Sequence, residues 1–133
     1  MTNNSYRVYV DGRMHQVIGL FWNKPGVITE VRYLRVVRDN VEIVGIKSPD
    51  PSIIMQSTGF TDSNGKTVFE GDIVELDYQY GKPVCLVEWC PIKFALVLKP
   101  INGERPKHKP HFRVAGKKKV EVIGNRFGCG NNL

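Results

Sequence analysis

Residues 6–22 read YRVYVDGRMHQVIGLFW, and this stretch decides the fold. Tyr6 to Val10 alternates aromatic or apolar side chains with polar ones, and Met14 to Trp22 is an apolar, β-favouring run. The two runs are joined by Asp11-Gly12, a dipeptide typical of tight hairpin turns because both residues tolerate a positive φ. The stretch therefore predicts an antiparallel β-hairpin.

The next segment begins after a turn, Asn23-Lys24-Pro25-Gly26, and has two interpretations. Apolar residues at three-residue intervals from Ile28 to Val37 suit one face of a helix. The same residues also alternate, and many are β-branched, which favours a strand. Because Asp39-Asn40 and a second apolar run, 41–46, follow, we expect a second hairpin over residues 27–46.

Short strand-like runs separated by turns continue to the end of the chain. Ser52 is expected to cap one short helical turn over 53–56, which Gly59 ends. Strands are expected over 67–69, 73–76, 84–89, 94–98 and around 120–123. The predicted fold is mainly β: a compact curled antiparallel sheet or a small SH3-like barrel with at most one short helix.

Length and composition predict one soluble domain over residues 1–133. A chain of 133 residues with 41% hydrophobic and 24% charged residues suits one core. The N-terminus has no stretch like a signal peptide, and the longest apolar runs are too short to cross a bilayer. Three cysteines suggest reduced thiols. We therefore expect a cytoplasmic protein.

The net charge of +6 is concentrated near the C-terminus. Residues 1–100 contain 11 Lys+Arg and 11 Asp+Glu, whereas residues 101–133 contain 8 and 2. A proline-containing segment of about 99–119 is expected to form an exposed basic loop. Its candidate binding residues are Arg105, Lys107, Lys109, Phe112, Arg113, Lys117, Lys118 and Lys119. Cations can neutralise phosphates and Phe112 can stack on a base, but a loop that only keeps the protein soluble fits equally well.

The centre of the chain carries a family signature. Residues 55–66 read MQSTGFTDSNGK, and residues 68–74 read VFEGDIV. This block resembles the MQxTG, D-x-NGK and aromatic-EGD-[IV]-V segments of the YopX-like proteins of bacteriophages and prophages. Residues 7–14, 87–89 and 122–125 also resemble that family. The resemblance implies a phage or prophage origin and a compact, mainly β fold, but no defined reaction. The basic segment 105–119 looks longer than the family's simple connection.

Four polar residues of the block, Gln56, Thr58, Glu70 and Asp72, have two interpretations. They could form a polar ligand site. We favour a structural role, because such residues at turns usually bind their own backbone.

Catalytic and metal-binding patterns find little support. Cys85, Cys90, His108, His111 and Cys129 contain zinc-ligand types, but the C-x4-C spacing along a strand separates the thiols. We find no nucleophile elbow, no phosphate-binding glycine loop and no convincing carboxylate pair. The sequence therefore predicts no enzyme, no cofactor and no metal.

Two functional hypotheses remain. The first is a non-enzymatic phage accessory protein that binds nucleic acid weakly through the basic loop. The alternative is a protein-binding inhibitor or modulator of a host factor, such as a defence or transcription component. Its contact surface would include Phe21, Trp22, Tyr78 or Tyr80. An acidic host protein would suit the basic loop as well, and strand edges could pair two copies of the chain.

Overall fold

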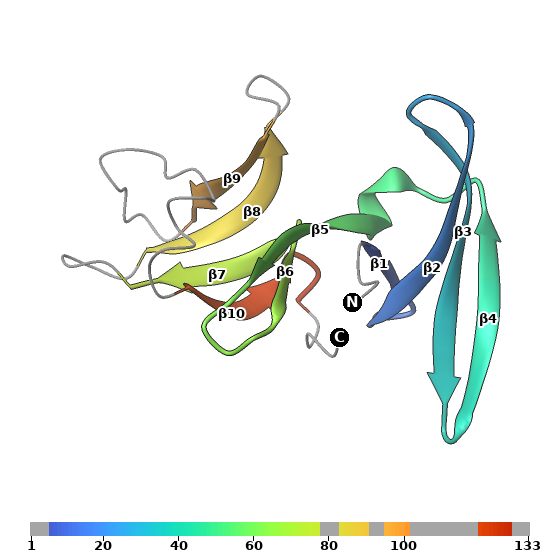
Figure 1. Ribbon diagram of the computed structural model, residues 1–133, viewed down its shortest axis with the longest axis horizontal. Coiled ribbons are helices and arrows are strands. Elements are labelled where there is room, and N and C mark those ends of the chain that lie inside the picture. Colours follow the sequence, from blue (N-terminus) through green and yellow to red (C-terminus); the bar gives the residue numbers. More distant parts are fainter. Residues whose placement is uncertain (1–5, 78–82, 91–94, 102–119, 129–133) are drawn as a thin grey trace. The chain divides into compact units, whose positions relative to one another are not determined.

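The computed structural model describes residues 6–77, 83–90, 95–101 and 120–128. Antiparallel strands form two sheets, ordered β4-β3-β2-β1-β5-β6 and β10-β7-β8-β9 (Figure 1). The strands are β1 (Tyr6–Val10), β2 (Arg13–Lys24), β3 (Val27–Val37), β4 (Asn40–Lys47), β5 (Ile54–Thr61), β6 (Thr67–Phe69), β7 (Asp72–Leu76), β8 (Val84–Cys90), β9 (Ala95–Pro100) and β10 (Val120–Asn125). The chain divides into two compact units, unit 1 up to Gln56 and unit 2 from Ser57.

Unit 1 contains both predicted hairpins. The β1–β2 turn has φ angles of 52° at Asp11 and 78° at Gly12, the positive values that a tight turn needs. β3 is a strand throughout, as favoured over the helix, and pairs in unbroken register with β4. The turn between them lies at Arg38 and Asp39, one residue earlier than expected, and Arg38 takes a φ of 54°.

The short helical turn is placed differently from the prediction. It is a 3-10 turn over Pro51–Ile53, and the carboxylate of Asp50 caps it by accepting from the Ser52 N–H at 3.0 Å. The predicted cap at Ser52 and the helix over 53–56 are therefore wrong. Ile54 to Gln56 instead pair with β1, because backbone pairing in a sheet satisfies their hydrogen bonds and the β-branched side chain of Ile54 suits a strand.

The core of unit 1 lies on one face of its sheet. Five residues from four strands form it: Val8, Val17, Val31, Tyr33 and Ile54. Because paired residues of antiparallel strands share a face, the register puts Val44 and Ile46 of β4 on this face too, opposite Tyr33 and Val31. We call it the inner face. The opposite, outer face carries the alternate residues of β3 and β4.

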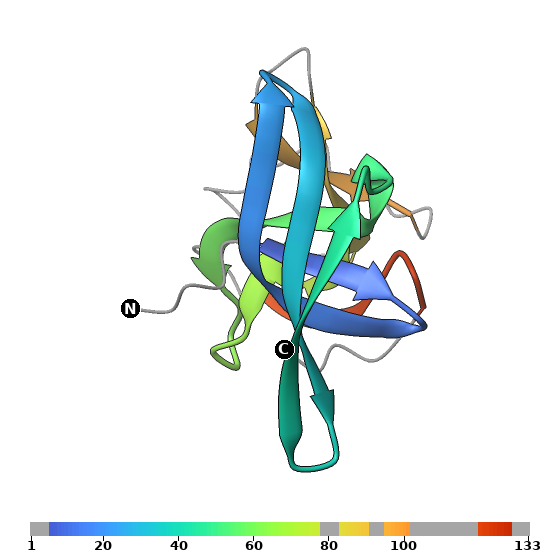
Figure 2. The same ribbon diagram turned by 90° about the vertical axis from the view of Figure 1, so that its right-hand side faces the viewer.

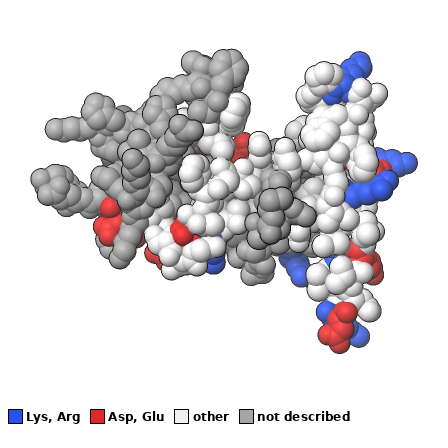
Figure 3. Space-filling view, viewed as in Figure 1, with Lys and Arg blue, Asp and Glu red and all other residues white. Residues whose placement is uncertain are grey.

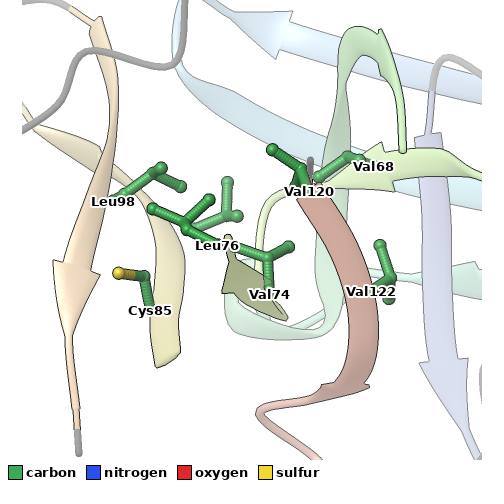
Figure 4. Packing of buried hydrophobic residues seen from close by; sticks show 8 residues of the cluster. Val68, Val74, Leu76, Cys85, Leu98, Val120 and Val122 are labelled. Atoms are coloured by element: carbon green, nitrogen blue, oxygen red, sulfur yellow. The ribbon is translucent and has the colours of Figure 1, made fainter. Parts of the chain in front are cut away.

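Unit 2 is built around a tighter core. Side chains from β6, β7, β8, β9 and β10 meet in it: Val68, Val74, Leu76, Cys85, Val87, Leu98, Val120 and Val122 (Figure 4). Six of the eight have no exposed surface. A bulge between Val122 and Gly124 shifts the pairing of β10 with β7.

The predicted fold class is confirmed. The chain is mainly β and antiparallel, and its described strands form curled sheets that are not closed into a barrel. The prediction of one YopX-like domain over 1–133 stays a prediction. Among the described residues, no helix has the length and apolar character needed to span a membrane.

Candidate binding surfaces

Three exposed apolar side chains lie near the β2–β3 end of unit 1. Phe21 is 43% exposed, Trp22 is 51% exposed and Val27 is 50% exposed. We call these three residues the aromatic tip. Trp22 pairs with Ile28, and Lys24 pairs with Val27, so the three residues lie within the last few pairs of the β2–β3 hairpin. The register shifts on both sides of Trp22, and a bulge of this kind re-aims side chains.

One ring of the aromatic tip is held in place by a cation. The Arg32 guanidinium carbon lies 4.8 Å from the centre of the Phe21 ring, within the range of a cation–π contact. The same guanidinium forms an ion pair with Glu30. Phe21 also lies over Gly19, where an added Cβ would come within 3.2 Å of the ring. The Phe21 ring is therefore orientated although it is exposed to solvent.

A second apolar surface continues along the outer face of β3 and β4. The cross-strand pairs Leu34–Ile43 and Val36–Val41 share this face. Val36, Val41 and Ile43 are 48%, 61% and 68% exposed. Figure 2 shows the β3–β4 hairpin running well beyond β1, and Figure 3 shows its tip as a cluster of charged atoms next to uncharged surface.

The arginines of β3 do not share one face. Arg32 pairs with Gly45 on the outer face, and Arg35 pairs with Glu42 on the inner face. A single basic surface that includes both is thereby excluded.

Several predicted binding residues lie outside the described residues. They are Tyr78, Tyr80 and the basic set Arg105, Lys107, Lys109, Phe112, Arg113, Lys117, Lys118 and Lys119. Binding through them stays a prediction.

The polar residues of the signature block mostly serve the local backbone. The Thr58 hydroxyl donates to the Val68 carbonyl at 2.8 Å and accepts from the Phe60 N–H at 3.2 Å. Asp72 is fully buried, and its carboxylate accepts from the Phe69 N–H at 2.8 Å. Gln56 is exposed on β5, where it pairs with Tyr6. These contacts favour the structural interpretation for Thr58 and Asp72.

The environment of Glu70 changes the pKa of its carboxyl. Desolvation raises the pKa of this carboxyl, nearby Arg126 lowers it, and Glu88 raises it further. Arg126 anchors the same corner, since its N–H donates to the Gly71 carbonyl at 2.8 Å. Glu70, Glu88 and Arg126 thus form a small charged cluster at the turn before β7.

Asp62, which no sequence pattern singled out as a site residue, organises the DSNGK turn. It is 6% exposed, and its Oδ1 accepts from the N–H groups of Asn64 and Lys66 at 2.9 and 2.8 Å. Its Oδ2 accepts from the Val122 N–H at 3.0 Å. An Asp two positions before Asn-Gly is the available signal, because Asp commonly binds the backbone two residues further on.

The zinc-ligand types do not assemble in the part of the chain that the structure describes. Cys85 has no exposed surface, and burial raises the pKa of its thiol to about 11. No group of three metal-ligating side chains occurs among the described residues. His108, His111 and Cys129 lie outside them. A buried thiol of high pKa is a poor nucleophile, so Cys85 acts as a small apolar core residue.

Comparison with known proteins identifies the family. A profile described as YopX protein matches residues 6–128. The chain belongs to the YopX family. Among solved structures, a similar fold occurs in protein EF1440 from Enterococcus faecalis, with 19% sequence identity, a TM-score of 0.54 and 91% of each chain covered. No curated protein matches the chain. The YopX assignment predicted from the signature block is thus confirmed.

Proposed function

We propose that this YopX-family chain is a non-enzymatic phage accessory protein that binds another protein through the aromatic tip of unit 1. The observation that carries the proposal is the exposure of Phe21, Trp22 and Val27 at one end of a hairpin. Exposed apolar patches commonly mark interaction sites, and tryptophan is enriched among the residues that dominate binding energy.

The charges around the tip indicate the chemistry of the partner. Lys24 and Arg32 are both exposed, and Glu30 is engaged with Arg32. A matching surface would offer an apolar pocket for Trp22 with carboxylates at its rim. Because the Phe21 ring is already orientated by Arg32, less side-chain entropy is lost on binding. A host protein of this kind suits the role of an inhibitor or modulator.

A matched pair of tryptophans tests the proposal. Trp22 in unit 1 is 51% exposed and Trp89 in unit 2 is 48% exposed, so replacing either with Ala removes a similar exposed surface. Tagged wild-type, Trp22→Ala and Trp89→Ala chains are used to capture proteins from nuclease-treated bacterial host lysate. A stoichiometric protein lost only with Trp22→Ala supports the proposal. Equal capture by all three chains, or capture of nothing, contradicts it.

A second candidate function rests on the charge of the C-terminal quarter. All six net positive charges fall within residues 101–133. Binding of single-stranded nucleic acid by this segment would weaken steeply as salt rises, because bound counterions are released. Replacing Lys117, Lys118 and Lys119 with Ala should abolish most of that binding. Affinity that is unchanged by the triple substitution contradicts this candidate.

A further inference from the structure

β4 is the outermost strand of its sheet, with no hydrogen-bonded strand on its other side in the part of the chain that the structure describes (Figures 1 and 2). The Ser48 N–H donates to the Thr29 carbonyl at 2.8 Å, which continues the β3–β4 register by one pair. Hydrogen-bonded and non-hydrogen-bonded pairs alternate along antiparallel strands. The backbone groups of Val41, Ile43, Gly45 and Lys47 therefore point away from β3, toward the free edge.

This edge has little of the usual protection against pairing, since Glu42 and Lys47 are the only charged residues of β4. Native edge strands are commonly interrupted by proline, shortened, or made repulsive with charges. β4 is eight residues long, contains no proline, and carries its only cation at its last residue, Lys47. Its outer-face residues Val41 and Ile43 are 61% and 68% exposed. Such a strand is a template for another strand.

The sequence of β4 is complementary to itself in one antiparallel register. When a two-fold axis passes through Val44, Val41 faces Lys47 of a second copy and Ile43 faces its Gly45. All four outward-pointing residues of each strand then meet outward-pointing residues of the other. If the axis is moved along the strand, some outward-pointing backbone N–H and C=O groups have no partner on the other strand.

Side-chain chemistry favours the same register. The large Ile43 side chain would lie opposite Gly45, so that the pair places no two bulky side chains against each other. The one acidic residue of β4, Glu42, lies toward its start and the one basic residue, Lys47, lies at its end. In this register Glu42 faces Ile46 of the second copy and Lys47 faces its Val41, so no like charges oppose each other. A register centred on Glu42 would stack two carboxylates.

We propose that β4 pairs antiparallel with β4 of a second copy of this chain, about a two-fold axis at Val44, so that two unit 1 sheets become one. The pairing uses the edge and outer face of β4 and does not depend on the aromatic tip. The dimer can therefore be tested independently of the protein partner proposed for the aromatic tip.

Cross-linking tests the register. The central Val44 pair would be non-hydrogen-bonded, with Cα atoms about 4.5 Å apart, a separation that a disulfide can span. Val44→Cys, in a chain with Cys90 and Cys129 replaced by Ser, should form a cross-linked dimer on mild oxidation. Val41→Cys in the same background should not, because Val41 lies opposite Lys47. Equal cross-linking at both positions overturns the proposal.

Sedimentation of the full chain over a range of concentrations tests the edge itself. Ile43→Lys should weaken dimerisation by about tenfold or more, because charged side chains protect edges. Val36→Lys is the matched control: Val36 shares the outer face, but it lies on the interior strand β3. The control should dimerise like the wild type. A wild-type chain that stays monomeric at every concentration, or a dimer insensitive to Ile43→Lys, overturns the proposal.

Discussion

The β-sheet of unit 2 and the β3–β4 hairpin of unit 1 are made from similar residues and use them in opposite ways. Val74, Leu76 and Val87 of unit 2 have no exposed surface. In the hairpin, Val41 and Ile43 are 61% and 68% exposed. Unit 2 therefore uses its aliphatic residues to stabilise itself, whereas the hairpin leaves its own accessible. We call unit 2 the framework and the β3–β4 hairpin the contact region.

The largest expected effect is on the free energy of unfolding, when one aliphatic side chain of each region is replaced with Ala. Leu76→Ala should lower the free energy of unfolding by about 2–5 kcal/mol, because it leaves a cavity in a fully packed core. Ile43→Ala should change it by about 0.5 kcal/mol or less, since the side chain is mostly exposed. Urea denaturation at low protein concentration, where chains are monomeric, measures both. Similar losses for the two variants would remove the distinction.

A smaller effect is expected at the turn between β5 and β6, where Asp62 accepts a hydrogen bond from Val122 of β10. Asp62→Ala should cost about 1–3 kcal/mol, because it leaves a buried N–H of Val122 without its acceptor. Asp62→Asn is the control, since it can retain the oxygen that binds Asn64 and Lys66 and should cost less. Thermal unfolding compares the two. If Asp62→Ala and Asp62→Asn lower the stability equally little, the hydrogen bonds of Asp62 do not stabilise unit 2.

The smallest expected effect concerns pH. Desolvation raises the folded-state pKa of Glu70 above its ordinary value of 4.5. The folded state then holds this proton more tightly than the unfolded state, so stability falls as pH rises from 4.5 through the folded pKa. Glu70→Gln should flatten that fall. Arg126→Ala should deepen it, because Arg126 opposes the shift. Unfolding curves measured across pH 4–8 give the fall in stability for each variant. The raised pKa of Glu70 requires a smaller fall for Glu70→Gln and a larger one for Arg126→Ala.

Local patterns in the sequence predicted most strands, because alternation and turn dipeptides act over short distances. Asp11-Gly12 and the run from Val27 to Val37 illustrate this, since each strand or turn is specified by its own residues. The helical turn was misplaced because Asp50, rather than Ser52, has the carboxylate that reaches the backbone.

Tertiary burial was harder to predict from sequence than local structure. Val36 and Ile43 look like core residues in the sequence, yet they are 48% and 68% exposed because their face of the hairpin has no covering layer among the described residues. Conversely, Arg7 and Asp62 are 0% and 6% exposed, although charged residues usually lie at the surface. Burial of this kind depends on contacts distant in sequence, such as that between Asp62 and Val122.

The division between framework and contact region is tested most directly by amide hydrogen exchange of the dilute full chain. The outward N–H groups of Val41, Ile43 and Gly45 should exchange rapidly. Those of Gly71 and Val122, which donate to Val87 and Asp62 within unit 2, should exchange slowly. Raising the protein concentration should slow only the first group. Equal protection of both groups in the dilute chain would contradict the account, because the edge of β4 would then not be free to bind anything.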